Sequence, residues 1–428
     1  MTIDQSRKMN SLESWLDRIQ AVDPNEIEPG LERIRTIYES LVKDKLSSKI
    51  VVIGGTNGKG TAAEFLSQIL ISNSKNVGTF TSPHLFSFNE RIKVNGIPVS
   101  EELIIESFSL IEEFRGEVKL TYFDFSTLAA LLIFNKLNVD FMVLEIGLGG
   151  RLDPVNITDS DLAILTNVEL DHQEWLGNDR EAIGKEKSGI FKFQKPVILG
   201  QENPPLTVIE ATKKLQNRVL NIGKDFTYTL NIPDQTWSYF FKGRNAVSYE
   251  NLPLQNLSVA SLSCALTSFF VLEEKGNFDL SCALKSTNLR GRCELINERF
   301  LLDVSHNESS VSFLSTFIDR NFAVGTKISA VLGVMADKNV KDMIAPLIGK
   351  INKWYTASPN IKRSMISEDV SSLVSSIQEA PVKTSNSVEE ACLIAHQETP
   401  SNGIIIIFGS FYTVAEAFPS IKHLKLVS

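Results

Sequence analysis

Short apolar runs rich in β-branched residues alternate along this chain with longer segments in which apolar residues recur every three or four positions. The runs predict buried strands, and the longer segments predict helices. Strands that alternate with helices are typical of an α/β protein with a parallel sheet. In the first part of the chain the predicted strands are 49–54, 76–81, 140–145, 161–168 and 195–200.

The predicted helices fall between these strands. The segment 126–137 is apolar nearly all round, which predicts a buried helix. The segment 225–254 is rich in aromatic and β-branched residues and predicts antiparallel strands instead. Further helices are predicted within 11–38, from about Thr61 onward, and at 101–114, 178–191 and 258–274.

A polar segment at 286–292 interrupts this pattern, and the alternation of strands and helices restarts after it. Such a segment predicts a domain boundary. We expect a first domain at 1–287 and a smaller, Rossmann-like α/β domain at 288–428. The strands predicted in the second domain are 300–304, 328–334, 352–356 and 403–408.

Composition narrows the function. The 428 residues are 43% hydrophobic and 22% charged, with a net charge of −8, which is ordinary for a globular protein and argues against nucleic acid as a partner. The first ten residues lack the apolar core of a signal peptide, and no apolar run is long enough to span a membrane. The four cysteines show no Cys-x-x-Cys spacing. We expect a cytoplasmic, monomeric enzyme that acts on small molecules and contacts no membrane.

The first chemical signal is a glycine-rich turn between a predicted strand and a predicted helix. In such a loop, backbone N–H groups converge on phosphate oxygens, Lys59 adds positive charge, and the Thr61 hydroxyl can reach Mg²⁺. Gly60 separates Lys59 from Thr61, which departs from the general phosphate-loop pattern. The alternative is a structural turn of any α/β protein. The favoured fold is a P-loop-containing parallel-sheet ATPase domain followed by the Rossmann-like domain.

Charged and polar residues follow other predicted strands. Glu145 lies inside an apolar run, where a carboxylate is costly unless it is paired or bound to a metal. The alternative is an ion pair with Arg151 or a nearby lysine. Three of the five histidines, His84, His172 and His306, fall just past predicted strands. Because ligands of open α/β sheets bind at that end of the strands, the histidines favour a binding site there.

Several motifs in order resemble those of the bifunctional dihydrofolate synthase/folylpolyglutamate synthase family, within the Mur ligase superfamily. The resemblance covers nearly the whole chain. It implies an ATP- and pterin-binding central domain at 1–287 and a C-terminal glutamate ligase domain at 288–428. The matching stretches are 55–61, 81–85, 90–91, 145–153, 170–172, 186–190, 291–292, 303–307 and 409–411.

The resemblance implies the chemistry of an ATP-dependent acid–amino-acid ligase. ATP phosphorylates a pterin-linked carboxylate, and the amine of L-glutamate then attacks the acyl phosphate. Members of the family join glutamate to 7,8-dihydropteroate and to tetrahydrofolates. Ser82, Glu145 and His172 would be Mg²⁺ ligands. Lys187 would carry a carbamate, or, as the fallback interpretation, would pair with phosphate as a bare cation.

The remaining site residues also follow from the resemblance. His306 would lie near the reacting groups as a second catalytic residue beside Lys187. The residues expected to bind ATP are Thr56, Asn57, Gly58, Lys59, Gly60, Thr61, Ser258, Arg292 and Asp303. The residues expected to bind the pterin substrate are Glu28, Pro29, Gly30, Thr121, Tyr122, Phe123, Asp124, Leu152, Asp153 and Pro154.

Three alternatives stay open at this point. Glu28-Pro29-Gly30 departs from the family's usual first pterin segment, so a folylpolyglutamate synthase without dihydropteroate activity is one alternative. A nucleotide-binding regulatory module would need the phosphate loop but not Glu145, His172 and Lys187 together. A ligase of cell-wall precursors would share the loop and the lysine. Ser258 also stands where the family usually has asparagine.

Overall fold

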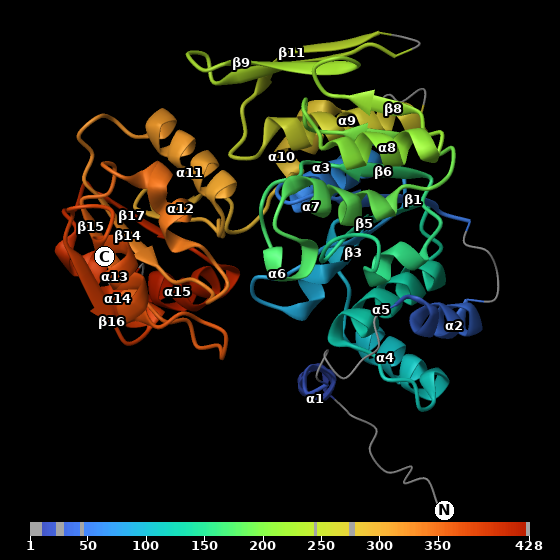
Figure 1. Ribbon diagram of the computed structural model, residues 1–428, viewed down its shortest axis with the longest axis horizontal. Coiled ribbons are helices and arrows are strands. Elements are labelled where there is room, and N and C mark those ends of the chain that lie inside the picture. Colours follow the sequence, from blue (N-terminus) through green and yellow to red (C-terminus); the bar gives the residue numbers. More distant parts are fainter. Residues whose placement is uncertain (1–10, 23–29, 43–46, 244–245, 274–278, 425–428) are drawn as a thin grey trace, which may run out of the picture. The chain divides into compact units, whose positions relative to one another are not determined.

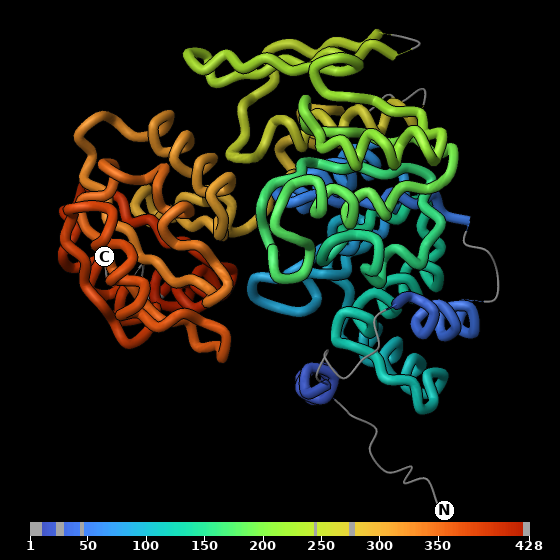
Figure 2. Tube along the Cα trace, in the orientation of Figure 1, coloured from blue at the N-terminus to red at the C-terminus, as the bar shows by residue number. Residues whose placement is uncertain are grey.

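The computed structural model describes residues 11–22, 30–42, 47–243, 246–273 and 279–424. The chain divides into two compact units, with the boundary between Asn288 and Leu289. Figure 1 labels the elements of each unit, and Figure 2 follows the chain through the first unit, blue to yellow, and then through the second, orange to red.

The first unit is built on an eight-stranded sheet in the order β4-β3-β2-β5-β1-β6-β7-β8. The strands from β2 to β8 in this order run parallel, and the hairpin of β3 and β4 adds an antiparallel edge. The strands are β1 (Lys49–Gly54), β2 (Val77–Phe80), β3 (Ile92–Val94), β4 (Ile97–Pro98), β5 (Phe141–Glu145), β6 (Leu162–Leu165), β7 (Val197–Leu199) and β8 (Val219–Asn221).

Helices cover both faces of this sheet, which is why its strands read as continuous apolar runs (Figure 1). Helices α3 and α9 pack against one face. Ile50 and Val52 of β1 belong to a hydrophobic core that also includes residues of α5. The helices of this unit are α1 (Leu12–Gln20), α2 (Glu32–Leu41), α3 (Lys59–Ser72), α4 (Glu101–Arg115), α5 (Tyr122–Lys136), α6 (Gln173–Leu176), α7 (Arg180–Lys187), α8 (Leu206–Lys214), α9 (Val259–Leu272) and α10 (Leu280–Ser286).

Two helices begin earlier than the sequence predicts. Helix α3 begins at Lys59, inside the glycine-rich loop, rather than at Thr61. Helix α5 begins at Tyr122 rather than Ser126, because Thr121 caps it: the Thr121 hydroxyl accepts the N–H of Asp124, and the Asp124 carboxylate accepts the N–H of Thr121. The predicted 121–124 segment is therefore the first turn of a helix.

The aromatic segment predicted as antiparallel forms a separate three-stranded sheet. It consists of β9 (Phe226–Asn231), β10 (Thr236–Phe241) and β11 (Val247–Pro253). The sheet packs on α9, where the Tyr239 hydroxyl lies 2.7 Å from Thr267 Oγ1 and the Phe241 and Phe270 rings stack.

The second unit holds a six-stranded sheet in the order β12-β13-β17-β14-β15-β16, parallel except for β12. The predicted Rossmann-like class is confirmed, but β12 and β16 were not predicted because they are short, partly exposed edge strands. The strands are β12 (Glu294–Ile296), β13 (Phe300–Leu302), β14 (Ile328–Leu332), β15 (Lys353–Ala357), β16 (Val382–Ser385) and β17 (Ile404–Phe408). The helices are α11 (Glu308–Asn321), α12 (Val340–Ile344), α13 (Ser367–Ser375), α14 (Val388–Glu398) and α15 (Phe411–Leu424).

Candidate active site

The glycine-rich loop joins the carboxyl end of β1 to the N-terminus of α3. Gly58 is the residue before the helix and has φ +81°, a conformation that favours glycine. No side chain caps this 14-residue helix. The N–H groups of its first turn are therefore available to an anion, and the helix dipole favours negative charge there. The loop fits a phosphate-binding site.

Residues at the end of β6 hold this loop in shape. Asn167 Oδ1 accepts the N–H groups of Thr56 (3.2 Å) and Asn57 (2.9 Å), and Thr166 Oγ1 donates to the Asn57 carbonyl at 2.7 Å. A Cβ added at Gly55, which has φ +141°, would lie 1.9 Å from Thr166 Oγ1. No local pattern in the sequence pointed to Thr166 or Asn167, which lie near the end of the predicted strand 161–168.

Two lysines meet at the same loop. Lys59 Nζ donates to the carbonyls of Gly55 and Thr56, and Lys187 Nζ donates to the Gly55 carbonyl at 3.0 Å. Lys187 is only 5% exposed. Burial, and then the charge of Lys59, lower the pKa of Lys187 to about 7. A large fraction of this amine is therefore neutral near pH 7, which is the nucleophilic form of a lysine.

Glu145 lies at the end of β5 beside the first turn of α3. It is 5% exposed, and its Oε2 accepts the Ser82 N–H at 3.0 Å. A Cβ added at Gly60 would lie 3.7 Å from the same oxygen. Arg151, the predicted alternative partner, instead pairs with Glu186. A buried carboxylate beside a phosphate loop fits a hard cation such as Mg²⁺.

His172 begins α6 with φ +51°. Its N–H donates to Asp171 Oδ1 at 2.9 Å, and its side chain is 40% exposed. In the described part of the chain, no three His, Cys, Asp or Glu side chains gather into a metal site. A cation at Glu145 would therefore need other ligands, and serine and phosphate oxygens are chemically suitable.

The two described pterin segments meet at Gly147. The ring of Phe123 occupies the space beside it, since a Cβ added at Gly147 would lie 2.6 Å from Phe123 Cζ. Asp153 Oδ2 accepts the N–H groups of Gly147 and Leu148 at 2.9 Å, and Asp153 Oδ1 accepts that of Val155. Burial raises the pKa of Asp153 to about 7 against the effect of these hydrogen bonds. An aromatic ring and a buried carboxyl thus lie in one region.

The other residues predicted to bind the substrate have contacts away from Gly147 or are exposed. Asp124 is fully buried and forms an ion pair with Arg33 of α2, a residue that the sequence analysis did not single out. Tyr122 lies under the guanidinium of Arg91 at 5.2 Å. Leu152 is exposed, and Pro154 begins a 3₁₀ helix (Pro154–Ile157). Gly30 is half-buried, whereas Glu28 and Pro29 lie outside the described residues.

Ser258 caps α9, and its hydroxyl accepts the Ser261 N–H at 3.3 Å. The N-terminus of α9 adjoins the phosphate loop, since a Cβ added at Gly58 would lie 2.2 Å from Ser261 Oγ. Ser258 is therefore in the neighbourhood of the predicted nucleotide site.

In the second unit, three predicted residues lie near one another in the chain. The Arg292 guanidinium stacks over Phe411 at 4.9 Å. Asp303 is buried and accepts the N–H groups of Cys293 and Ser305, both at 2.8 Å. His306 Nδ1 lies 2.9 Å from the Val304 carbonyl, which fits a tautomer with the proton on Nδ1.

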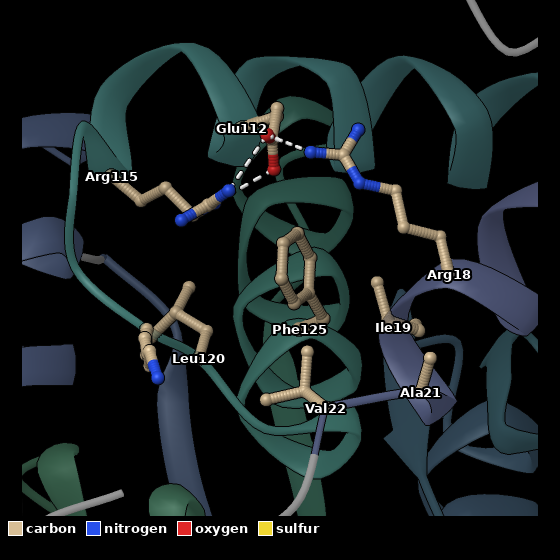
Figure 3. A pocket seen from close by; sticks show the side chains of 9 residues that line it. Arg18, Ile19, Ala21, Val22, Glu112, Arg115, Leu120 and Phe125 are labelled. Atoms are coloured by element: carbon tan, nitrogen blue, oxygen red, sulfur yellow. Dashed lines mark hydrogen bonds and ion pairs between the residues drawn. The ribbon is translucent and has the colours of Figure 1, made fainter. Parts of the chain in front are cut away.

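A cavity of about 270 Å³ opens elsewhere in the first unit, between α1, α4 and α5. Figure 3 shows the Glu112 carboxylate between Arg18 and Arg115, above Phe125 and Leu120. None of the predicted site residues lines it. Both arginines pair with Glu112, so we interpret this cluster as structural.

The comparisons with known proteins first define the class. The family model of the Mur ligase middle domain matches residues 53–254, and that of the Mur ligase glutamate ligase domain matches residues 291–411. The dihydrofolate synthase/folylpolyglutamate synthase of Buchnera aphidicola subsp. Schizaphis graminum is 35% identical over 98% of this chain and 99% of its own. The chain therefore belongs to the dihydrofolate synthase/folylpolyglutamate synthase family of the Mur ligases, as the motifs predict.

Solved structures of members of this family also match the chain. Escherichia coli FolC in complex with DHPP and ADP matches with a TM-score of 0.91 at 31% identity, covering 98% of this chain and 99% of that one. A bifunctional folylpolyglutamate synthase/dihydrofolate synthase with Mn, AMPPNP and L-glutamate bound matches with a TM-score of 0.88 at 31% identity, covering 97% of this chain and 99% of that one. The predicted enzyme class, an ATP-dependent ligase, is confirmed. Within the described residues, no helix has the length and apolarity that a membrane span requires.

Proposed function

We propose that this chain joins L-glutamate to 7,8-dihydropteroate, giving dihydrofolate, and to tetrahydrofolates, giving folylpolyglutamates. The observation that carries the proposal is the meeting of Lys187 with the phosphate loop at Gly55, beside the buried carboxylate of Glu145. A protein that only binds or hydrolyses ATP has no need for a buried lysine of lowered pKa there. A ligase that stabilises an acyl phosphate does need such a lysine.

In this proposal Thr56, Asn57, Gly58, Lys59, Gly60 and Thr61 bind the ATP phosphates through backbone N–H groups, one lysine and one hydroxyl. Ser258 contributes from the N-terminus of α9, and Arg292 and Asp303 are the nucleotide-binding residues of the second unit. Bound Mg²⁺ would neutralise phosphate charge and polarise the transferred group. Ser82, Glu145 and His172 are its proposed protein ligands.

The proposed reaction proceeds in two steps. An oxygen of the substrate carboxylate takes the γ-phosphoryl group from ATP, and ADP leaves. The amine of glutamate then attacks the acyl carbon and loses a proton as phosphate leaves, which forms the amide. Lys59 and the N–H groups of α3 stabilise negative charge in both steps. We assign His306 a place near the reacting groups.

Lys187 has a particular part in this proposal. Its neutral amine can attack CO₂, lose a proton and become a carbamate, so that a cation is replaced by an anion. The lowered pKa and the burial of Lys187 support this assignment.

Phe123 and Asp153 are the described residues best suited to a pterin. A flat ring can stack on the aromatic side chain, and a carboxyl can accept hydrogen bonds from the amino-pyrimidine edge. Glu28, Pro29, Gly30, Thr121, Tyr122, Asp124, Leu152 and Pro154 complete the proposed substrate site.

The test is a phosphate-release assay on the purified chain with ATP, Mg²⁺ and L-glutamate. Dihydropteroate and tetrahydrofolate are supplied in separate reactions, and each reactant is omitted in turn. We expect release with both acids and none when either the acid or glutamate is missing. Release with tetrahydrofolate alone would leave a monofunctional folylpolyglutamate synthase. Release that ignores acid and glutamate would favour a nucleotide-binding regulatory module.

The proposed partners are these small molecules alone, in the cytoplasm, with the chain as a monomer. The net charge of −8 supports the exclusion of nucleic acid. Light scattering after size-exclusion chromatography tests the monomer, which predicts 47.6 kDa.

A further inference from the structure

After β2 and Thr81, the chain forms a loop without regular structure, 82–87, that leads to the 3₁₀ helix η2 (Phe88–Arg91). This loop begins with Ser82, a proposed metal ligand, whose N–H binds Glu145. A loop without a backbone ladder needs other partners for its N–H groups. The position of Ser82 therefore depends on what fixes this loop.

Glu90 supplies those partners. Its Oε2 accepts the N–H of Leu85 at 2.8 Å, and its Oε1 accepts the N–H groups of Phe86 at 2.9 Å and Ser87 at 2.8 Å. One carboxylate thus satisfies three consecutive backbone donors, and hydrogen bonds from N–H groups to a charged acceptor are among the stronger ones. The loop is closed around the Glu90 side chain.

Arg91 supplies a second set of contacts. It is 7% exposed, its Nε donates to His84 Nδ1 at 2.8 Å, and its carbonyl accepts the Thr81 N–H at 2.9 Å. Its guanidinium also lies over the rings of Phe88, at 5.8 Å, and Tyr122, at 5.2 Å. Arg91 therefore touches both the loop and the first turn of α5, where the proposed substrate segment begins.

We propose that Glu90 and Arg91 are positioning residues: they hold the 82–87 loop so that Ser82 faces Glu145, and Arg91 joins this loop to the substrate segment at Tyr122. The inference rests on the proposed function, because it assigns Ser82 to the metal. A glutamine at position 90 keeps the size of the side chain, but its NH₂ group cannot accept an N–H. A lysine at position 91 keeps the charge but loses the planar donor that stacks and pairs.

The test measures the loop and the metal separately in the full-length chain. Hydrogen–deuterium exchange follows the amides of Leu85, Phe86 and Ser87, and electron paramagnetic resonance follows Mn²⁺ binding in the presence of AMPPNP. In Glu90→Gln we expect those amides to exchange at least about tenfold faster and Mn²⁺ affinity to fall about 10- to 100-fold. Glu90→Asp should recover part of both, because it restores the acceptor charge.

For Arg91→Lys we expect weaker Mn²⁺ binding together with a raised KM for the pterin acid, and a smaller change in kcat. The matched controls are Glu113→Gln and Arg218→Lys, which change exposed residues and should leave all readouts unchanged. Melting curves and circular dichroism confirm that each variant is folded.

Unchanged amide exchange in Glu90→Gln would overturn the inference whatever the activity, and so would wild-type Mn²⁺ affinity despite faster exchange. A wild-type chain that fails to bind Mn²⁺ with AMPPNP would instead contradict the proposed function. The exchange experiment still tests the role of Glu90 in that case.

Discussion

At the scale of single residues, the site combines groups that are costly to bury. Lys187 and Glu145 are nearly inaccessible, and the carboxyl of Asp153 is buried with a pKa raised to about 7. Each is held by backbone groups: Lys187 by a carbonyl, Asp153 and Glu145 by N–H groups. Perturbed groups of this kind cluster at functional sites more often than elsewhere. Their chemistry is testable one side chain at a time.

Lys187→Ala should lose most ligase activity, about 100-fold or more, because a charged group at the transferred phosphate is removed. If Lys187 carries a carbamate, added acetate or formate should restore part of the activity by occupying its place. Steady-state kinetics with and without these acids measures the rescue. Lys185→Ala, in the same helix but exposed, is the control. Loss without rescue would favour the bare lysine, and unchanged turnover would remove Lys187 from the mechanism.

Thr61→Ala should weaken binding of Mg·ATP about tenfold, roughly 1.4 kcal/mol, because the hydroxyl that we assign to the nucleotide site is lost. Isothermal titration calorimetry measures the affinity, and Thr61→Ser, which keeps the hydroxyl, should bind like the wild type. Equal affinity in the alanine and serine variants would contradict a role of the Thr61 hydroxyl in binding Mg·ATP.

At the scale of elements, the sequence predicts most of what surrounds the site. The buried parallel strands are apolar runs that can be read from the sequence, and β5 differs from β1, β2, β6 and β7 in ending with a carboxylate, which marks Glu145. The start of α5 was missed because a capping box, Thr121 with Asp124, outweighs the aromatic residues that follow. Arg33 and Asn167 were missed for another reason: each acts on a residue distant in sequence, and no local pattern records such a contact.

The ion cluster of α1 and α4 gives a prediction about stability. Glu112→Ala should destabilise the first unit by about 1–2 kcal/mol, because Arg18 and Arg115 lose their partner in a partly buried place. Thermal or urea unfolding measures the loss, and Glu113→Ala, at the exposed neighbouring position, should stay within about 0.5 kcal/mol of the wild type. Equal stability of the two variants would contradict a role for the cluster.

The same cluster predicts that the stability of the first unit depends on pH. Burial alone would raise the pKa of Glu112, but the hydrogen bonds and charges of Arg115 and Arg18 outweigh it and lower the pKa below the ordinary 4.5. A carboxyl whose pKa is lower in the folded protein than in the unfolded chain stabilises the fold at pH values above its unfolded-state pKa. This stabilisation is lost as the pH falls through the folded-state pKa. The difference between wild type and Glu112→Ala should therefore be largest above pH 4.5 and shrink in acid.

At the scale of the whole molecule, the chain consists of two α/β units with separate sheets. The six-stranded sheet of the second unit has its own core, which includes Leu332, Ile406, Trp354 and Val311. The nucleotide chemistry, by contrast, is proposed to need residues of both: the phosphate loop in the first unit, and Arg292, Asp303 and His306 in the second. We therefore expect the second unit to fold by itself, whereas catalysis should require residues of both units.

Residues 289–428 expressed alone should fold, because the sheet and its helices bury an apolar core within this segment. We expect helix and strand signals in circular dichroism and one cooperative thermal transition. The fragment should release no phosphate from ATP, since it lacks the phosphate loop, and mixing it with a 1–288 fragment tests whether activity requires both. A non-cooperative transition in the isolated segment would show that its core depends on the rest of the chain. Ligase activity in 1–288 alone would instead remove Arg292, Asp303 and His306 from the reaction.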